Sequence, residues 1–418
     1  MSRTVGLIAA TLTGNHGAEA MAITVVGRLR ERMPKLRFIL FSYYPQADRQ
    51  IIADKGVTVA SGAPSSLVAS HLFGALLGAL LPRKKRQTSA LLPAEAQRLS
   101  ACDVLVDLAG VAFIDGREKF LPFNILTLLP AMLLGVPVVK ASQALGPFKH
   151  FVNRIAARTI LPRCSLIVAR GRETRSHLDS IKLTEVLVAP DVAFLLRDTD
   201  RLVEIDTDGV DRIVAQTRAW RDAGRKIVGL CPSSVIYAKL GAPYIDKLVE
   251  LVIRIEGDGY SVVLIPNATR RDTDSLRNND IPVLRKVSEG LSDRGWHGRA
   301  VFFDRDGDVI SIKQLIEECD AMMVSRFHAM VGALSLAKPT VVLGWSHKYL
   351  EVMADFGLED CVFDYANLRV EELYPKIVSV VERSGPLSDK IASLLPDVRK
   401  RAASQIDAIA ALLQRQTS

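Results

Sequence analysis

Short apolar runs alternate with amphipathic stretches along most of the chain, and this alternation predicts a parallel α/β fold. The predicted strands of the first half are nearly continuous apolar runs, as is typical of strands that are buried on both faces of a sheet. The stretches between several of them have helical spacing of apolar residues. Strands are expected at residues 5–10, 37–42, 57–60, 104–108, 136–141, 166–169 and 186–188, and helices at 17–32, 123–134 and 173–180.

The same alternation starts again after a polar, charged stretch at 198–208, which we interpret as a linker. We therefore expect an N-terminal α/β domain at 1–197, a C-terminal α/β domain at 209–385 and a helical tail at 386–418. Two doubly wound, Rossmann-like parallel sheets facing across a cleft form the GT-B arrangement. The second domain has predicted strands at 226–230, 261–265, 300–303, 321–324 and 340–343, and predicted helices at 244–256, 310–318 and 329–336.

The stretch 320–348 is the most informative part of the chain. A buried strand ends at Ser325, where a helical pattern begins that carries Arg326 and His328 in its first turn. The next predicted strand is followed by Lys348. Ligands of open α/β sheets bind beyond the carboxyl ends of the strands, and a helix N-terminus favours anions. The pattern therefore predicts a site for a small, strongly anionic molecule.

Further candidates follow predicted strands of the first domain. Gly14 and Asn15 stand where a strand leads into a helix, so backbone N–H groups there can face a ligand. Asp107 is a candidate general base, Gln143 a candidate ligand contact, and Arg170 is suited to grip a carboxylate or phosphate. The plainer interpretations are a turn, a cap or a surface ion pair, and the residues alone leave both open.

Composition narrows the partners. The formal net charge of +8 favours anionic partners, whereas basic and aromatic residues are not interleaved as nucleic-acid binding would require. The five cysteines are widely spaced, which favours reduced thiols in a cytoplasmic protein and makes a zinc site improbable. The acidic run 304–308 suggests a calcium loop, but its twelfth position is Leu315 instead of glutamate. We expect no essential metal and no cofactor.

One apolar segment raises the question of a membrane. Residues 67–81 are too few to span a bilayer, which takes about 20 residues. They are followed by the basic run Arg83-Lys84-Lys85-Arg86, and an apolar helix that ends in such a cluster can lie on an anionic leaflet. Two interpretations stay open: peripheral contact of residues 67–86 with the inner face of the cell membrane, and an ordinary buried helix with a charged exit.

Taken in order along the chain, these motifs resemble the polysaccharide pyruvyl transferase family. The block Arg326-Phe327-His328-Ala329 followed by Pro339 and Lys348 is its most specific part. The chain departs from the family pattern at Ala18, Ala109 and Gly171, all in the predicted N-terminal domain. The other matching segments are Gly14-Asn15 to Glu19-Ala20, Gly110, Ser142-Gln143 to Gly146-Pro147, Arg170 to Glu173, and Ala189-Pro190-Asp191-Val192-Ala193-Phe194.

The resemblance implies phosphoenolpyruvate as donor, bound by the C-terminal domain, and a sugar diol of a polysaccharide or of its lipid-linked precursor as acceptor, bound by the N-terminal domain. The product would be a cyclic pyruvate ketal, with phosphate released. Arg326 and Lys348 would hold the donor, His328 would be the general acid, and Glu19 or Asp107 the base. The remaining expected substrate-binding residues are Ser325, Arg170, Gly14, Asn15 and Gln143.

Two alternatives remain open at this stage. In the first, the chain is another GT-B enzyme that uses a nucleotide-sugar. In the second, it is a catalytically degenerate member of the family that acts as a binding or scaffold protein in polysaccharide biosynthesis. The departures at Ala18 and Gly171 motivate the second alternative.

Overall fold

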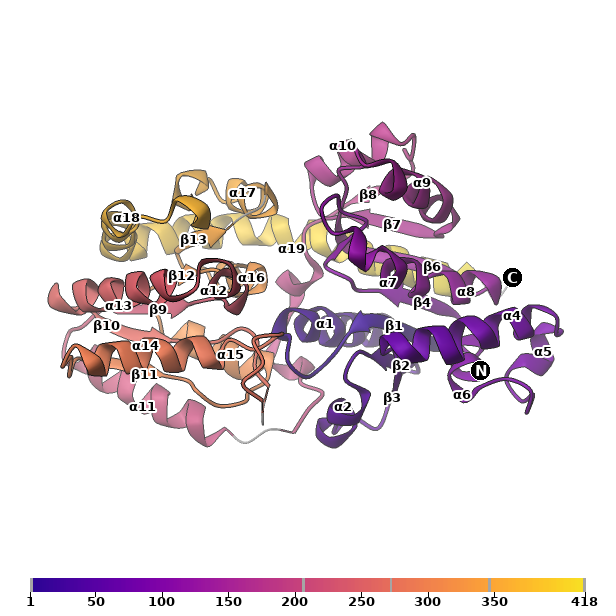
Figure 1. Ribbon diagram of the computed structural model, residues 1–418, viewed down its shortest axis with the longest axis horizontal. Coiled ribbons are helices and arrows are strands. Elements are labelled where there is room, and N and C mark those ends of the chain that lie inside the picture. Colours follow the sequence, from indigo (N-terminus) through magenta and orange to yellow (C-terminus); the bar gives the residue numbers. More distant parts are fainter. Residues whose placement is uncertain (1–2, 205–206, 271–272, 345–346, 416–418) are drawn as a thin grey trace. The chain divides into compact units, whose positions relative to one another are not determined.

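The computed structural model describes residues 3–204, 207–270, 273–344 and 347–415. These residues form two compact units (Figure 1). The first comprises Met1–Leu12, Met21–Glu204 and Arg399–Ser418, and the second comprises Thr13–Ala20 and Ile205–Val398. The chain passes between the units after Glu204, which lies inside the predicted linker. The contacts of Thr13–Ala20 place this segment in the second unit, although the sequence led us to expect it in the first.

In the first unit, every strand pair of the described sheet is parallel, as predicted. The strand order is β3-β2-β1-β4-β6-β7-β8, and β5 pairs with β6. The strands are β1 (Thr4–Ala10), β2 (Arg37–Ser42), β3 (Val57–Ser61), β4 (Val104–Asp107), β5 (Val111–Ala112), β6 (Val138–Leu145), β7 (Leu166–Ala169) and β8 (Leu187–Val188).

The second unit has a parallel sheet of the order β11-β10-β9-β12-β13-β14. Its central strands are buried along their whole length, which explains why they stand out in the sequence as apolar runs. The strands are β9 (Ile227–Cys231), β10 (Ser261–Leu264), β11 (Ala300–Phe302), β12 (Ala321–Val324), β13 (Thr340–Gly344) and β14 (Val362–Asp364).

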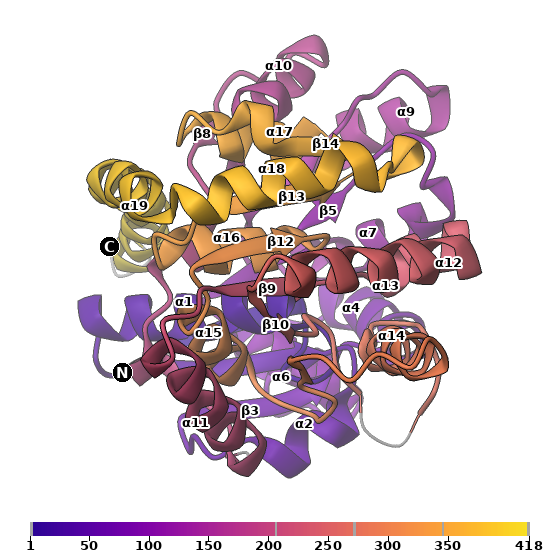
Figure 2. The same cartoon turned by 90° about the vertical axis from the view of Figure 1, so that its left-hand side faces the viewer.

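Helices cover both faces of this second sheet (Figure 2). On one face, α13 (Ala242–Gly257) packs against α14 (Ile281–Asp293) and α18 (Val370–Glu382). On the other face, α15 (Val309–Glu317) packs against α11 (Asp208–Asp222) and α16 (Phe327–Ser335). The unit also contains α12 (Ser234–Leu240) and α17 (His347–Ala354).

The helices of the first unit differ from the prediction in two places. The expected helix 123–134 is two helices, because Pro130 has no N–H group to continue a helix and instead stands in the first turn of the second one. The expected helix 67–81 is a π-helical turn, η1 (Leu67–Leu72), followed by α4 (Phe73–Ala79). The other helices are α1 (His16–Arg32), α2 (Pro45–Ile51), α3 (Pro64–Ser66), α5 (Arg83–Arg86), α6 (Ala94–Ser100), α7 (Leu121–Leu126), α8 (Leu129–Leu133), α9 (Phe151–Ile160) and α10 (Arg172–Ser180).

Strand β6 is longer than predicted. It continues to Leu145, since Gln143 pairs with Ala169 of β7 and Ala144 pairs with Val111 of β5. Ser142 and Gln143, which we expected in a loop, are therefore fully buried within a strand.

The predicted helical tail is α19 (Ser384–Arg415). Its residues up to Val398 belong to the second unit and those from Arg399 to the first. Among the described residues, no helix combines the length and apolar character needed to cross a bilayer. The prediction of two doubly wound α/β units with parallel sheets is confirmed.

Candidate functional site

The stretch 320–348 forms the predicted succession of strand, helix and strand. After β12, Arg326 has an extended backbone (φ −113°, ψ 136°) and is the N-cap residue of α16. The helix therefore begins at Phe327, between the start of the helical pattern at Ser325 and the predicted helix 329–336, and His328 is its second residue. His328 thus lies at a helix N-terminus beyond the carboxyl end of a central strand, where anions are favoured.

Arg326 is held by a buried carboxylate. Its Nε donates to Asp280 Oδ2 (3.1 Å), and its Nη2 donates to Asp280 Oδ1 (2.5 Å) and to Ser234 Oγ (2.9 Å). The same carboxylate accepts the backbone N–H groups of Ser234 (2.8 Å) and Asn267 (3.2 Å). Asp280 therefore ties together the loops that follow β9, β10 and β12.

This ion pair limits how much of the Arg326 side chain can meet a ligand. Burial opposes the guanidinium charge, but the charge and hydrogen bonds of Asp280 outweigh it and raise the pKa of Arg326 further. Two of its three nitrogens are committed to Asp280 and Ser234, so the guanidinium cannot grip a donor with its whole fork. The side chain remains 16% exposed, which leaves only its edge available to a ligand.

His328 lies against the first turn of α1. A Cβ atom at Gly17 would come 2.1 Å from Nδ1 of His328, so only glycine fits beside the imidazole. The imidazole packs edge-on against Phe327, with 5.3 Å between the ring centres. Nζ of Lys348 lies 5.0 Å from the centre of the same Phe327 ring. The structure thus brings His328 and Lys348 to one aromatic ring but directs Arg326 toward Asp280.

A buried acid–base pair lies in the same turn of α1. His16 Nδ1 is 2.8 Å from Glu19 Oε2, and this oxygen also accepts the backbone N–H of Val309 (2.9 Å) at the start of α15. On its other side, His16 Nε2 is 2.9 Å from Thr269 Oγ1. Glu19 Oε1 is buried and makes no hydrogen bond within the described part of the chain. One carboxylate oxygen therefore remains able to accept a proton or a hydroxyl group.

Burial sets the protonation of this pair. It raises the pKa of Glu19 to about 7, although the hydrogen bond and charge of His16 and the N–H of Val309 lower it. Burial also opposes the charge of His16, but Glu19, Asp306 and Asp308 outweigh it, so the pKa of His16 is raised. Near neutral pH the pair can therefore release or take up a proton, as general acid–base catalysis requires.

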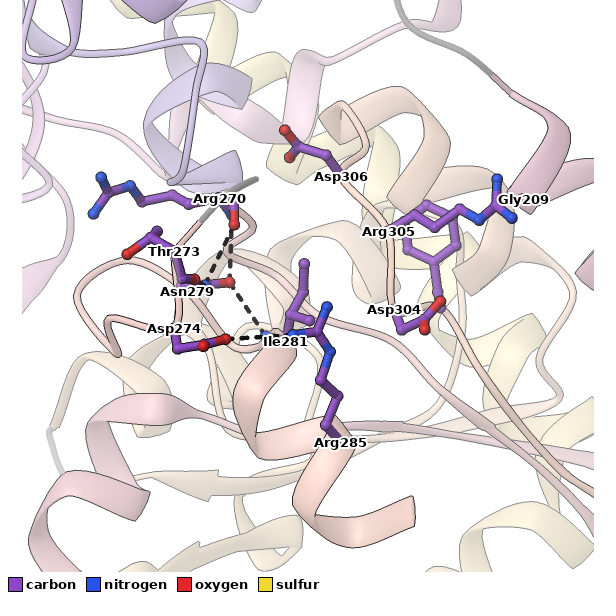
Figure 3. A pocket seen from close by; sticks show the side chains of 11 residues that line it. Gly209, Arg270, Thr273, Asp274, Asn279, Ile281, Arg285, Asp304, Arg305 and Asp306 are labelled. Atoms are coloured by element: carbon purple, nitrogen blue, oxygen red, sulfur yellow. Dashed lines mark hydrogen bonds and ion pairs between the residues drawn. The ribbon is translucent and has the colours of Figure 1, made fainter. Parts of the chain in front are cut away.

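A polar pocket of about 560 Å³ (Figure 3) is linked to this pair by hydrogen bonds through Thr269 and Asp306. It lies beyond the carboxyl ends of β10 and β11, within the second unit. Thr269 Oγ1, which contacts His16, donates to Oδ1 of Asp306 (2.5 Å) in the pocket wall. Since Thr269 donates to Asp306, it accepts from His16, which places a proton on Nε2. The lining residues are Gly209, Arg270, Thr273, Asp274, Asn279, Ile281, Arg285, Phe303, Asp304, Arg305 and Asp306.

Three other predicted ligand-binding residues have local structural roles. Asn15 Oδ1 accepts the N–H groups of Gly17 (3.1 Å) and Ala18 (3.4 Å), which caps α1. Gly14 is buried and has a φ of 87°, a backbone conformation that favours glycine. Ser325 is fully buried, and its N–H donates to Cys231 in β9. These contacts form the loops of the site; Ser325 is closed to a ligand, whereas Asn15 is partly exposed.

The candidates of the first unit belong to its core, contrary to the prediction. Asp107 is fully buried and paired with Lys140 Nζ (2.7 Å), which is equally buried, so it is not available as a base. Gln143 donates from Nε2 to the carbonyl oxygen of Asp107 (2.8 Å). Arg170 pairs with the buried Asp191 (3.1 Å) and donates to the carbonyl oxygen of Ser142.

One group of possible metal ligands occurs among the described residues. Donor atoms of Asp115, Glu118 and His150 lie within 4.8 Å of one another in the first unit. Asp115 Oδ2 accepts the N–H groups of Lys149 and His150, and His150 Nδ1 lies 2.5 Å from Glu118. These hydrogen bonds are enough to explain the grouping without an ion.

With this geometry established, comparison with known proteins assigns the chain to a family. The sequence profile of the family described as polysaccharide pyruvyl transferase matches residues 15–347, which is most of the chain. The chain belongs to the polysaccharide pyruvyl transferase family. It is therefore a transferase, as predicted, and it is similar to the amylovoran biosynthesis protein AmsJ of Erwinia amylovora. The two are 22% identical over 307 residues, which cover 72% of this chain and 71% of AmsJ.

Solved structures with the same fold cover nearly the whole pyruvyl transferase chain. A putative UDP-N-acetylglucosamine 2-epimerase from Listeria monocytogenes superimposes with a TM-score of 0.62 at 11% identity, covering 100% of this chain and 98% of its own. A UDP-glucose:anthocyanidin 3-O-glucosyltransferase in complex with UDP gives 0.57 at 13% identity, covering 99% of both chains. At these identities the likeness concerns the fold alone, and it confirms the predicted GT-B-like class.

Reasoning from the sequence missed three residues of this candidate site: His16, Thr269 and Asp280. A signal existed for His16, because it precedes Glu19 by three residues and such residues share one face of a helix. Asp280 and Thr269 lie in a loop without a recognisable motif, and only the fold brings them to Arg326 and His16.

Proposed function

We propose that this transferase moves pyruvate from phosphoenolpyruvate onto two hydroxyl groups of a sugar, forming a cyclic ketal and releasing phosphate. The family assignment supports pyruvyl transfer to a polysaccharide. The similarity to a protein of amylovoran biosynthesis supports an extracellular or cell-envelope polysaccharide, or its lipid-linked precursor, as the acceptor.

The position of His328 carries the assignment of the reaction site. It stands at the N-terminus of α16, against the first turn of α1, and shares the ring of Phe327 with the ammonium of Lys348. In the proposal, Lys348, the exposed edge of Arg326 and the N–H groups at the start of α16 hold the phosphate and carboxylate of the donor. Asp280 serves as a positioning residue, since it fixes the guanidinium.

The reaction needs one acid and one base, and its protons balance. His328 protonates the methylene carbon of phosphoenolpyruvate, which becomes the methyl group and leaves an oxocarbenium-like centre at C2. Attack by the first hydroxyl forms one C–O bond. The C–O bond to phosphate then breaks, and the second hydroxyl closes the ketal. Of the two hydroxyl protons, one restores the acid and the other leaves with the phosphate.

We assign the base to Glu19, acting with His16. Of the two carboxylates predicted for this role, Asp107 is tied to Lys140, whereas Glu19 keeps one oxygen without a hydrogen bond in the described structure. The raised pKa of Glu19 suits a group that takes a proton near neutral pH. Thr269 and Asp306 extend this pair by hydrogen bonds to the wall of the polar pocket.

Phosphate release from phosphoenolpyruvate in the presence of a glycan acceptor tests the proposal. We expect phosphate and a pyruvylated product, detected by mass spectrometry, and we expect both to disappear in His328→Ala while the fold persists. His297→Ala is the matched control, because His297 is an exposed histidine of the same unit. Full activity of His328→Ala would refute the assignment of the acid.

A binding experiment separates the alternatives. A saturating ligand at a hundred times its Kd adds about 2.7 kcal/mol to the free energy of unfolding, so thermal shifts with phosphoenolpyruvate and with UDP-sugars can be compared directly. Stabilisation by a UDP-sugar alone would favour a glycosyltransferase. Stabilisation by neither, without phosphate release, would favour a scaffold protein. Peripheral membrane contact through residues 67–86 stays a prediction that is independent of this chemistry.

A further inference from the structure

Two long segments of the first unit contain no acidic residue. Residues 55–94 include five lysines and arginines, and residues 119–172 include eight, but neither segment has an aspartate or glutamate. The whole chain contains 46 acidic residues, so gaps of this length are unusual. Lys140 and Arg170 are buried in ion pairs with Asp107 and Asp191. The other lysines and arginines of the two segments give their surface a positive charge that no acidic residue within the segments offsets.

The same two segments carry most of the exposed apolar surface. Of the eleven large hydrophobic side chains that are exposed in the described residues, nine lie within them. The two outside are Val188 and Leu350. The nine are Val68, Phe73, Leu76, Leu80, Leu91, Phe120, Phe151, Val152 and Ile155. Soluble surfaces rarely gather large apolar side chains in this way unless the surface meets an apolar partner.

Helix α4 turns its large side chains outward and its small residues inward. Phe73 and Leu76 are 56% and 52% exposed, and Leu80, just after the helix, is 83% exposed. Gly74 and Gly78 are buried, and a Cβ atom at either would lie within 3 Å of a neighbouring side chain. The core under the helix is therefore full, and packing does not account for the large side chains outside.

Helix α9 has the same organisation. Its buried side contains Asn153, whose Nδ2 donates to the carbonyl oxygen of Phe113 (2.9 Å) and fixes the start of the helix. Its exposed side carries Phe151, Val152 and Ile155, which are 74%, 62% and 48% exposed. Exposed arginines at 154 and 158 stand among them. An outward face of this composition is typical of helices that lie in a membrane interface.

A row of packed helices links the two regions within the first unit. Helix α4 packs against α8, α8 packs against α7, and α7 packs against α9. Phe120, 44% exposed, stands just before α7 in the middle of this row. Figure 1 shows these helices in the same unit. We call the exposed side chains of residues 67–91 and 119–163 the acid-free face.

We propose that the acid-free face docks onto an anionic lipid bilayer, with α9 as a second contact beside the segment 67–86. The apolar side chains enter the acyl boundary, and the lysines and arginines attract anionic headgroups. The charge favours a bilayer over a second copy of this chain, because two copies of a face without acidic residues would repel each other. The inference does not depend on the donor or on the reaction.

Flotation of the full chain with lipid vesicles tests this inference. We expect binding to vesicles of phosphatidylcholine with phosphatidylglycerol, little binding to phosphatidylcholine alone, and weaker binding at high salt. The double variants Phe73→Ser/Leu80→Ser and Phe151→Ser/Ile155→Ser should each weaken binding at least about tenfold. All four residues are exposed, so the variants are expected to fold, which circular dichroism and thermal melting will check.

A charge variant and a matched control sharpen the test. Replacing Arg83, Lys84 and Lys85 by glutamine should weaken binding roughly a hundredfold. Arg86 is left in place because it donates to the carbonyl oxygens of Leu81 and Leu134. The control is Val188→Ser/Leu350→Ser, which removes the two exposed hydrophobic residues outside the acid-free face and should leave binding unchanged.

Three results would overturn the inference. The first is absence of binding to anionic vesicles. The second is binding that the variants of the acid-free face leave unchanged, since another surface would then be responsible. The third is a dimer in solution that these variants convert to a monomer, because the face would then join two copies of the chain.

Discussion

Gly17 offers a direct test of where His328 must lie. A Cβ atom at this position would come 2.1 Å from Nδ1 and 2.5 Å from Cγ of the imidazole, so Gly17→Ala forces His328 to move. Such an overlap costs about 1–3 kcal/mol. Alanine in a helix recovers about 0.5–1 kcal/mol relative to glycine. We therefore expect a net loss of stability of about 0–2.5 kcal/mol.

Activity should fall much further than stability. A displacement of about 1 Å in a catalytic group can cost roughly a hundredfold in rate, so we expect a loss of this order in kcat/KM for phosphate release from phosphoenolpyruvate. Gly332→Ala is the control, since its Cβ would meet Ile316 at an ordinary distance of 3.5 Å in the helix that carries His328. We expect this control to keep wild-type activity.

A double-mutant cycle isolates the contact. His328→Ala removes the two nearest atoms but keeps the Cβ atom, which would still lie 2.9 Å from the new methyl group, so Gly17→Ala should destabilise the protein less in that background than in the wild type. Urea unfolding of the four proteins measures the coupling. Wild-type turnover in Gly17→Ala, or the same stability change in both backgrounds, would show that the imidazole does not need this position.

Three further predictions concern buried charges. If Glu19 is the base, kcat/KM should rise as pH increases through about 7, and Glu19→Gln should remove this limb. Because its pKa is raised on folding from 4.5 to about 7, Glu19 favours the folded state most below pH 4.5, and this contribution is lost as pH rises through 7. Between pH 4.5 and 7, the free energy of unfolding of the wild type should fall by up to about 3 kcal/mol relative to that of Glu19→Gln, measured by urea titrations at each pH. If the free energies of the two proteins change in parallel with pH, the assignment is contradicted. Asp280→Asn leaves Arg326 buried without its counter-charge, so it should lower the free energy of unfolding by about 3 kcal/mol, measured by urea unfolding. It should also weaken binding of the donor, measured by calorimetry. A variant with unchanged stability and donor binding would rule out the positioning role of Asp280. Asp107→Asn or Lys140→Met alone should cost about 3–5 kcal/mol in chemical unfolding, whereas Asp107→Leu with Lys140→Met should recover most of it, and a double variant as unstable as the single ones would contradict this interpretation.

The sequence was sufficient to predict the fold class because both sheets are parallel and covered on both faces. Strands such as β9 and β12 are buried at every residue, so they appear as short apolar runs. The ends of elements depend on partners that the local sequence does not reveal. Strand β6 continues through Gln143 because Ala169 pairs with it, and Pro130 divides a predicted helix.

The site was predictable only where its residues are close in sequence. Arg326 and His328 follow one strand and Lys348 follows the next. Because the carboxyl ends of parallel strands lie at the same edge of a sheet, the sequence predicts that these three residues are near one another. The partner of Arg326 did not follow from this pattern, because Asp280 lies 46 residues away in a loop. The polar residues of the first unit were misinterpreted for a related reason. Asp107 has the features of an exposed turn carboxylate until Lys140 is placed beside it.

The carboxylate of Asp280 holds three loops in place at the edge of the sheet where a substrate would bind. With four donors from three loops on its two oxygens, the rim of the sheet is already assembled before any ligand arrives. A ligand that settles there would not have to immobilise these loops, so less of its contact energy would be spent on ordering the chain. Free and occupied forms of this rim should therefore have nearly superimposable backbones.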